Sequence, residues 1–413
     1  MARARTVQAA LWGVVFASAC SFEAPPAVGE WAVEPPQGEE AVGDALDPNL
    51  FWTDTTPVIW PHRCKAGILT ATGTAVTAAD GTAALLLPTF DEIRTLHIVA
   101  HTPGHSPTLH EVIDPDGEVV LEGEQWWGDE VLTQSVFAAE GRETRGLQWP
   151  ITGDQRLDTH GTWTFHIGAA DPTARLTEGV DVTWTAWAAL DTAPGQGCVQ
   201  VELAAPHEGE ERTTIREAAE AAMAHAAATY AAADIDLLWS WREQPVAIDP
   251  HYDGRGSPAL AAFAETTPPW VIPMVVVDQI GEEPHTLGRS VHGGPMAATP
   301  VSAVTIAWKP HVRANTGTDL LSTELLGHTM AHELGHYLGL PHPVEWDAEG
   351  HAVRWDALED TPRCDEEASC AQDLGQNLMF PTSWCFNHPD VCSAPDRLTA
   401  EQVAVLHHWG GTL

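Results

Sequence analysis

The pattern of apolar and polar positions divides the chain into two parts that meet near residue 196. In residues 59–195, short segments of alternating apolar and polar residues, rich in β-branched and aromatic types, are separated by Gly, Pro and Asp; residues 95–100, 162–167 and 180–187 are examples. Alternation with a period of two is typical of half-buried strands. No convincing helical period occurs there. The pattern therefore predicts an all-β domain over residues 59–195.

After residue 196 the pattern alternates between strands and helices. Residues 198–204, 236–239, 270–277 and 301–308 are predicted strands, and the Ala-rich residues 213–233 are a predicted helix, capped by Thr213 or Thr214 with Glu217 in its first turn. Another helix is predicted to begin near Thr318 or Asp319, and a last helix to cover residues 399–408. These elements predict an α/β (α+β) domain over residues 196–413.

The second of these helices carries the sequence HELGHYLGLPH at residues 332–342. On a helix, His332 and His336 lie one turn apart on the same face, so both can bind one metal ion at about 2.0–2.1 Å. Gly339 can adopt a positive φ and end the helix, so that the chain turns back and His342 becomes the third ligand. Glu333 lies beside the ligands without binding, and a fourth position is left for water. We therefore predict one catalytic Zn²⁺ with Glu333 as general base.

Two other ligand sets compete with this one. His328 lies one turn before His332, but three successive turns span about 12 Å, too far for one tetrahedral ion, so we expect His328 beside the site or on the surface. If a downstream carboxylate, that of Glu359 or Glu366, were the third ligand, Gly339 and His342 would have no role.

Chance is a poor explanation for the complete motif. With 21 His and 34 Gly in 413 residues, its full spacing is expected by chance in about one chain in several thousand of this composition.

The motif resembles the HExxHxxGxxH signature of the metzincin zinc peptidases, which is followed downstream by a methionine-containing turn. Residues 377–381, NLMFP, are similar to that turn in the matrixins, and the resemblance implies that Met379 packs beneath the metal without binding it. Residues 359–362, EDTP, with the cysteines around them and residues 275–280 and 287–288 upstream, are similar to the pappalysin and cytophagalysin group, which we rank first. Pro343 and Pro381 depart from these patterns, and Pro381 stands where many metzincins have a tyrosine that helps hold the oxyanion.

The resemblance implies a zinc metalloendopeptidase that hydrolyses protein or peptide substrates. Zinc held by three neutral imidazoles lowers the pKa of a coordinated water, and Glu333 would take its proton and later deliver it to the leaving amine. An edge strand expected near residues 293–299 would bind substrate as an added strand. The alternative, from a different class, is a surface lipoprotein whose β-sandwich recognises a target and whose zinc site is structural or inactive.

Two segments of the predicted β domain, TLHIVAHTPGHSPTLHEVIDPDGEVV and GTWTFHIGAADP, are similar to the P domain that accompanies proprotein convertases, a jelly-roll β-sandwich. The resemblance implies a role in stabilising the catalytic domain or in binding a target, and no catalytic set is evident in it. Its scattered histidines could include a metal site, but histidines on polar strands are more often solvated, which is the expectation here. They are His97, His101, His105, His110, His160 and His166.

The N-terminus resembles a bacterial lipoprotein signal over residues 1–20. Arg3 and Arg5 precede an apolar stretch at residues 9–19, which is too short to span a membrane, and Cys20 would become the lipidated first residue. A plain secretory signal is the alternative. Residues 21–58, rich in Pro, Glu, Gly and Ala, are a predicted disordered acidic tether. We therefore expect an exported protein, on the bacterial outer membrane or cell surface as a lipoprotein, or otherwise periplasmic or secreted.

Six cysteines remain after Cys20, and an even set in an exported chain predicts disulfides. Their positions hint at a long bridge between Cys64 and Cys198. Cys64 stands in PHRCK, which is faintly similar to the propeptide cysteine that keeps matrixins latent, but the disulfide is favoured. The other four would brace the loop around the Met-containing turn: Cys364, Cys370, Cys385 and Cys392.

The charge of the chain restricts its partners. It has 19 Lys+Arg against 58 Asp+Glu, a formal net charge of −39, which argues against nucleic acid and anionic membrane surfaces as partners. Membrane contact is therefore expected only through a lipid anchor. Such acidity could also bind structural Ca²⁺. The sequence Asp114-Pro115-Asp116-Gly117, however, lacks the ligand count of a calcium loop and is predicted to be a turn.

Overall fold

The structure is a computed structural model that describes residues 53–54, 68–122, 143–150, 157, 161–173, 175–190, 197–254, 257–268, 270–282, 286–290, 302–313, 320–347, 350–356, 358–382 and 396–409. These residues form mostly β-sheets with a few helices. Among them, no helix combines the length and the apolar character that crossing a membrane requires. Cys20, His160 and the edge strand expected at residues 293–299 lie outside the described residues, so the predictions about them stay predictions.

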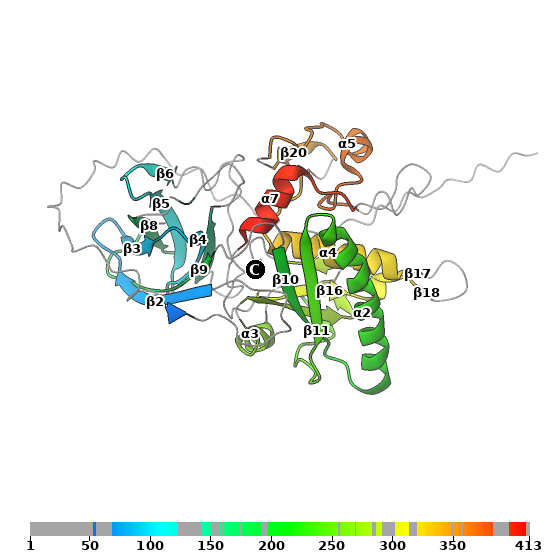
Figure 1. Cartoon of the computed structure of the whole chain (residues 1–413). Coiled ribbons are helices and arrows are strands. Elements are labelled where there is room, and N and C mark those ends of the chain that lie inside the picture. Colours follow the sequence, from blue (N-terminus) through cyan, green and yellow to red (C-terminus); the bar gives the residue numbers. More distant parts are fainter. Residues whose placement is uncertain are drawn as a thin grey trace, which may run out of the picture.

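The N-terminal part contains two antiparallel sheets, a five-stranded sheet with the order β1-β2-β9-β4-β7 and a four-stranded sheet with the order β3-β8-β5-β6 (Figure 1). The strands predicted at residues 95–100, 162–167 and 180–187 are confirmed as β4, β8 and β9. Strand β1 lies within the stretch predicted to be a disordered tether and pairs with β2. The strands are β1 (Thr53–Asp54), β2 (Ile68–Val76), β3 (Thr82–Thr89), β4 (Ile93–His101), β5 (Ser106–Ile113), β6 (Val119–Glu122), β7 (Thr144–Trp149), β8 (Gly161–Ala170) and β9 (Asp181–Leu190).

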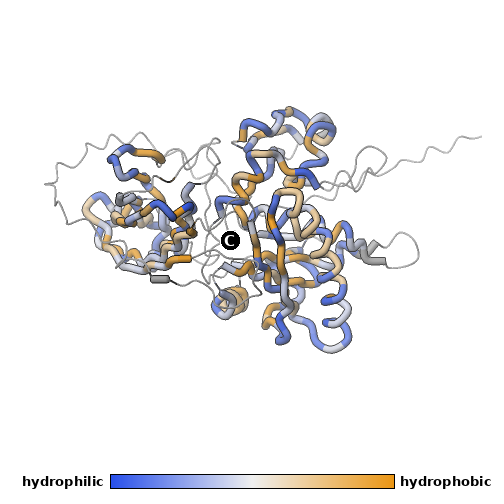
Figure 2. Tube along the Cα trace, viewed as in Figure 1, coloured by the Kyte–Doolittle hydropathy of each residue, from blue (hydrophilic) through white to orange (hydrophobic). Residues whose placement is uncertain are grey.

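Alternate side chains of these strands form an apolar core. Leu85 on β3, Leu96 and Ile98 on β4, and Trp163 and Phe165 on β8 are all buried in one cluster. Burial of each such side chain contributes about 1.5–3 kcal/mol relative to exposure. Figure 2 shows apolar residues concentrated along the strands of both parts of the molecule.

His97 on β4 corrects the expectation that the histidines of this part are solvated. Its side chain is 0% exposed, and within the described part of the chain neither ring nitrogen has a hydrogen-bond partner. The ring centroid of Trp187 on β9 lies 6.0 Å from that of His97 in a T-shaped arrangement. Because burial disfavours the imidazolium form, the pKa of His97 falls to about 3. Hydrophobic alternation does not reveal such a residue, because β4 is covered on both faces.

Burial of neutral His97 predicts that the β part loses stability in acid. The unfolded chain binds a proton near pH 6.5 and the folded chain only near pH 3, so the stabilisation present above pH 6.5 is lost as the pH falls. The expected slope is at most about 1.4 kcal/mol per pH unit between these values. Urea unfolding of wild type and His97→Leu between pH 4 and pH 8 measures it, with exposed His110→Leu as control. An equal pH slope in wild type and His97→Leu would contradict this role.

The C-terminal part is built on a mixed five-stranded sheet with the order β11-β10-β13-β16-β15. Its first four strands run parallel, and β15 is antiparallel to β16 at one edge. The strands predicted at residues 198–204, 236–239, 270–277 and 301–308 are found, the last one shorter than expected. They are β10 (Gly197–Ala204), β11 (Ile235–Trp241), β13 (Val271–Val277) and β16 (Val304–Ala307), with β15 at Gly288–Arg289.

Helix α2 (Gly209–Ala231) begins one turn earlier than its sequence predicts. Its N-cap is Glu208, which makes no side-chain capping bond, so the prediction of Thr213 or Thr214 as N-cap was wrong. The hydroxyls of these threonines instead donate to backbone carbonyls one turn back within the helix. Glu217 consequently lies beyond the first turn.

Helix α4 (Thr323–Tyr337) carries the histidine motif and packs against α2 (Figure 1). It begins after the predicted Thr318 or Asp319, because Leu320–Leu321 form strand β18, which pairs with β17 (Val312–Arg313). The hydroxyl of Ser322 then caps the helix by accepting from the amide of Leu325 at 3.3 Å. Gly327 lets the two helices approach closely, since a Cβ there would lie 2.5 Å from the carbonyl oxygen of Ala222.

The chain after α4 forms a smaller, less regular region. A hairpin of β19 (Val344–Trp346) and β20 (Ala352–Trp355) is followed by α5 (Glu367–Leu374). The last predicted helix is confirmed as α7 (Ala400–His408), with Thr399 as N-cap and a capping box closed by Gln402. Other short elements are β12 (His251–Tyr252), β14 (Gln279–Ile280), α3 (Pro258–Glu265) and η2 (Lys309–His311).

Candidate metal centre

Three histidines meet where α4 ends and the chain turns back. His332 and His336 come from successive turns of α4, and Gly339 with a φ of 107° ends the helix. The turn is closed by hydrogen bonds from the amide of Gly339 to the carbonyl of His336 and from the amide of Leu340 to the carbonyl of Gly335, both 2.9 Å. This reversal brings His342 to the other two, so the structure places the three predicted ligands together.

The imidazoles are buried and face one another through the same ring atom. The Nε2 atom of His342 lies 3.2 Å from Nε2 of His332 and 3.1 Å from Nε2 of His336. Tetrahedral coordination at 2.0–2.1 Å would place ligand nitrogens about 3.3 Å apart. The spacing therefore suits a single small cation between the rings.

Hydrogen bonds from the outward Nδ1 atoms determine which nitrogen of each ring carries the proton. Nδ1 of His332 donates to the carbonyl oxygen of Leu378 and Nδ1 of His336 to that of Leu340, both at 2.7 Å. Nδ1 of His342 donates to Oε1 of Glu345 at 2.9 Å. In a neutral imidazole whose Nδ1 carries the proton, Nε2 presents a lone pair. Three lone pairs thus point into one buried space, and a bound cation relieves their repulsion.

Glu333 lies on the same helix but outside this group of ligand atoms. Its side chain is 3% exposed, and burial raises the pKa of its carboxyl to about 8, although the charge of Arg289 acts to lower it. It rests against β15, where a Cβ on Gly288 would lie 2.5 Å from Cγ and 2.7 Å from Oε1 of Glu333. The edge of the sheet is therefore next to the predicted base. No sequence pattern indicated that Arg289 influences the pKa of Glu333.

The contact with β15 predicts that Gly288→Ala lowers activity without removing the metal. The added methyl group would displace the Glu333 carboxylate, and a shift of about 1 Å in a reacting group can cost about 10²-fold in rate. The three imidazoles lie elsewhere and would keep their positions. Zinc content and peptide hydrolysis measured on the same preparation check this. A variant that loses zinc together with activity would contradict a local effect on Glu333.

Met379, the methionine of the predicted turn, is buried against α4. Its sulfur lies so close to Gly335 of α4 that a Cβ at Gly335 would collide with it. The turn is held by Asn377, whose Oδ1 accepts from the amide of Met379 at 2.9 Å. Asn377 also exchanges two hydrogen bonds with Gln402 of α7, at 2.8 and 3.2 Å. These bonds fix the carbonyl of Leu378, which orients His332.

The competing ligands lie apart from this group. His328 is buried one turn before His332 with its ring centroid 6.3 Å away, and it is not among the clustered ligand atoms. The amide of Glu359 donates to Glu401 at 2.6 Å, and Glu366 is the N-cap of α5. Among the described residues, neither carboxylate joins the three histidines.

A second cluster of possible ligands contains His207, Glu211 and Asp278. The carboxylate of Asp278 accepts from Nε2 of His207 at 2.9 Å, from Nε1 of Trp308 at 2.8 Å and from Nζ of Lys309 at 2.6 Å. Burial opposes ionisation of Asp278, but these hydrogen bonds outweigh it and lower the pKa. The ammonium of Lys309 already supplies the positive charge, so we interpret this cluster as structural.

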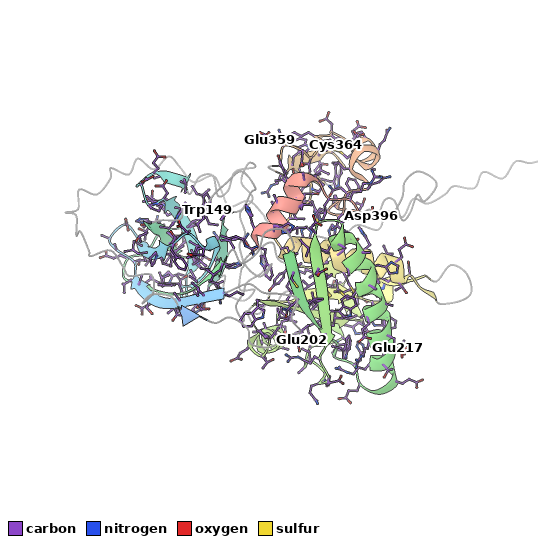
Figure 3. All side chains as sticks on the ribbon, viewed as in Figure 1. Trp149, Glu202, Glu217, Glu359, Cys364 and Asp396 are labelled. Carbon is purple, nitrogen blue, oxygen red and sulfur yellow. A yellow bond between two sulfur atoms is a disulfide. The ribbon has the colours of Figure 1, made fainter. Side chains whose placement is uncertain are left out.

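The disulfides of the structure match the predicted ones in part. Cys364 and Cys370 form a disulfide with Cα atoms 5.2 Å apart, which matches the local bracing predicted in this region (Figure 3). Cys198 is also disulfide-bonded. Cys64, Cys385 and Cys392 lie outside the described residues, so the remaining pairings and the propeptide-switch alternative are still predictions.

The acidic loop at residues 114–117 is a turn, as expected. Oδ1 of Asp114 accepts from the amides of Asp116 and Glu118 at 2.9 and 2.8 Å. Amide donors on this oxygen indicate an Asx-type turn.

No protein-family model and no curated protein matches this chain. Metalloproteinase-II from Bacteroides fragilis is similar with 13% identity and a TM-score of 0.28, over 55% of this chain and 62% of that one. Myroilysin shares 14% identity with a TM-score of 0.23, over 52% and 93% of the two chains. A family two carbohydrate esterase from Clostridium thermocellum shares 12% identity with a TM-score of 0.14, over 50% and 61%. The chain thus spans less than two thirds of the metalloproteinase-II chain. All three TM-scores are low, so the interpretation of the site rests on its own geometry.

Proposed function

We propose that this chain is a zinc-dependent endopeptidase of metzincin type that acts on proteins or peptides. The observation that carries the proposal is the convergence of three buried Nε2 atoms whose rings are fixed by outward hydrogen bonds, with Glu333 on the same helix. His332, His336 and His342 would hold the ion. Bound zinc supplies Lewis acidity, which lowers the pKa of water and polarises a peptide carbonyl.

The residues of the chain would do the rest of the chemistry. Glu333, buried beside the ligands, can accept a proton from the attacking water and return it to the leaving amine. Burial raises the pKa of this carboxyl, whereas the charge of a zinc ion held by the neighbouring histidines would lower it and favour the basic carboxylate form. The edge of the sheet at β15 lies next to Glu333 and offers backbone groups for an extended peptide.

The intact general base argues against the alternative of a binding lipoprotein with a structural zinc site, because a purely structural site closes its fourth position and needs no base. Metal analysis combined with digestion of an unfolded protein, with and without a chelator, separates the two functions. We expect about one zinc per chain, hydrolysis in its presence and none after chelation. Zinc without hydrolysis would favour the structural alternative and sink the peptidase proposal.

We also propose that the protein is exported and anchored through Cys20, with the pappalysin-like group ranked before the matrixins. The Cys364–Cys370 disulfide supports export, since disulfides persist in oxidising compartments. Mass spectrometry of the mature N-terminus tests the anchor. A lipidated Cys20 would support it, whereas cleavage without lipid would leave a plain secreted protein. Structural Ca²⁺ stays a prediction from the acidic composition.

A further inference from the structure

The third histidine differs from the other two in what orients it. His332 and His336 donate from Nδ1 to backbone carbonyls, those of Leu378 and Leu340. These oxygens are fixed by the fold and belong to no replaceable side chain. His342 instead donates to the carboxylate of Glu345, three residues later, at 2.9 Å. Of these three Nδ1 hydrogen bonds, this one has a side chain as its acceptor.

Glu345 is held in place by the hairpin that follows the motif. It lies on β19 between Val344, which is fully buried, and Trp346, whose ring packs against Phe380 with centroids 6.4 Å apart. Across the hairpin its register partner is Arg354 on β20, which places an opposite charge beside it. The backbone of Glu345 is therefore anchored on both sides, and its carboxylate faces His342.

The chemistry of this contact bears on metal binding. A carboxylate that accepts from Nδ1 keeps the proton there, presents the Nε2 lone pair inward and limits rotation of the ring. Such partners of metal ligands typically change metal affinity by 10–100-fold when removed. The side chain of Glu345 is 36% exposed, so solvent screens its charge, and its main contribution is the hydrogen bond that sets the ring orientation.

We propose that Glu345 is the positioning residue for the third metal ligand and sets the zinc affinity of the site. The inference rests on the proposed zinc site but not on its catalytic activity. Glu345 contacts His342 at Nδ1, the ring nitrogen that faces away from the cluster of Nε2 atoms. It would therefore act on the metal through His342.

The test compares the zinc affinity of wild type, Glu345→Ala and Glu345→Gln by competition with a chromogenic chelator, with surface Glu217→Ala on α2 as control. Glu345→Ala is expected to bind zinc about 10–100-fold more weakly. Glu345→Gln, whose amide oxygen can still accept from Nδ1, should lie close to wild type. Wild-type affinity in Glu345→Ala would overturn the proposal. Equal weakness of the Ala and Gln variants would also overturn it, since charge and not orientation would then be responsible.

Thermal unfolding of the metal-free proteins separates positioning from stability. The melting temperatures of metal-free wild type and Glu345→Ala should agree, while the rise on adding zinc should be smaller in the variant. A lower melting temperature without metal, with an unchanged zinc-induced rise, would show a structural role instead and overturn the proposal. A wild type that binds zinc but cleaves no peptide would refute the peptidase function while leaving the role of Glu345 intact.

Discussion

Replacing Glu333 by glutamine is expected to leave zinc bound and to lower peptide hydrolysis by about 10²–10⁴-fold. The amide has the size of the carboxyl and fits the same buried place against Gly288, so the helix and the three imidazoles keep their positions. It cannot accept a proton from water, because an amide is not basic at neutral pH. The loss therefore isolates proton transfer from metal binding.

The measurement is kcat/KM on an unfolded protein or a quenched peptide, together with zinc content on the same sample. Glu324→Gln, in the first turn of the same helix, is the matched control, since it removes a carboxylate about two turns before His332. Hydrolysis at the wild-type rate in Glu333→Gln would show that another group acts as base. Loss of zinc in that variant would show that the carboxylate is a ligand.

Replacing His342 by alanine is expected to abolish tight zinc binding and with it all hydrolysis. Two imidazoles on one helix leave the ion without the third protein ligand, so the site can no longer complete tetrahedral coordination from the protein. The matched substitution is His328→Ala, which removes a buried histidine one turn from His332 on the same helix. This variant should keep zinc within a few-fold of wild type.

The pair of variants decides between two ligand sets on one helix. A zinc affinity that falls in His342→Ala but stays near the wild-type value in His328→Ala supports His332, His336 and His342 as the ligands. The opposite result would mean that the metal lies along the helix between residues 328 and 336. Circular dichroism of both variants checks that α4 is intact, so that a loss of binding reports the ligand itself.

The three histidines and Glu333 could be predicted from the sequence because helical spacing and one glycine fix their relative positions. The partners of the outward nitrogens could not be predicted in the same way. The carbonyls of Leu378 and Leu340 are backbone groups that every residue has, so no residue type marks them. Glu345 is different, since a carboxylate three residues after a predicted ligand was visible and could have been considered.

Strands with one polar face could be predicted from the alternation of apolar and polar residues. The first residues of the helices were predicted less accurately. Helix α2 begins at Gly209 without a side-chain cap, so a search for Ser, Thr, Asp or Asn placed its start too late. Helix α4 begins late because the residues before Ser322 pair with another strand, a long-range contact that local pattern does not contain. His97 was misjudged for a related reason, since whether the second face of β4 is covered depends on tertiary packing.

The bonds between Gln402 and Asn377 tie the aim of a metal ligand to a helix that supplies no ligand. The carbonyl that accepts from His332 belongs to a turn held by α7, which begins at Ala400. Weakening α7 would therefore loosen the orientation of His332 without touching any of the three histidines.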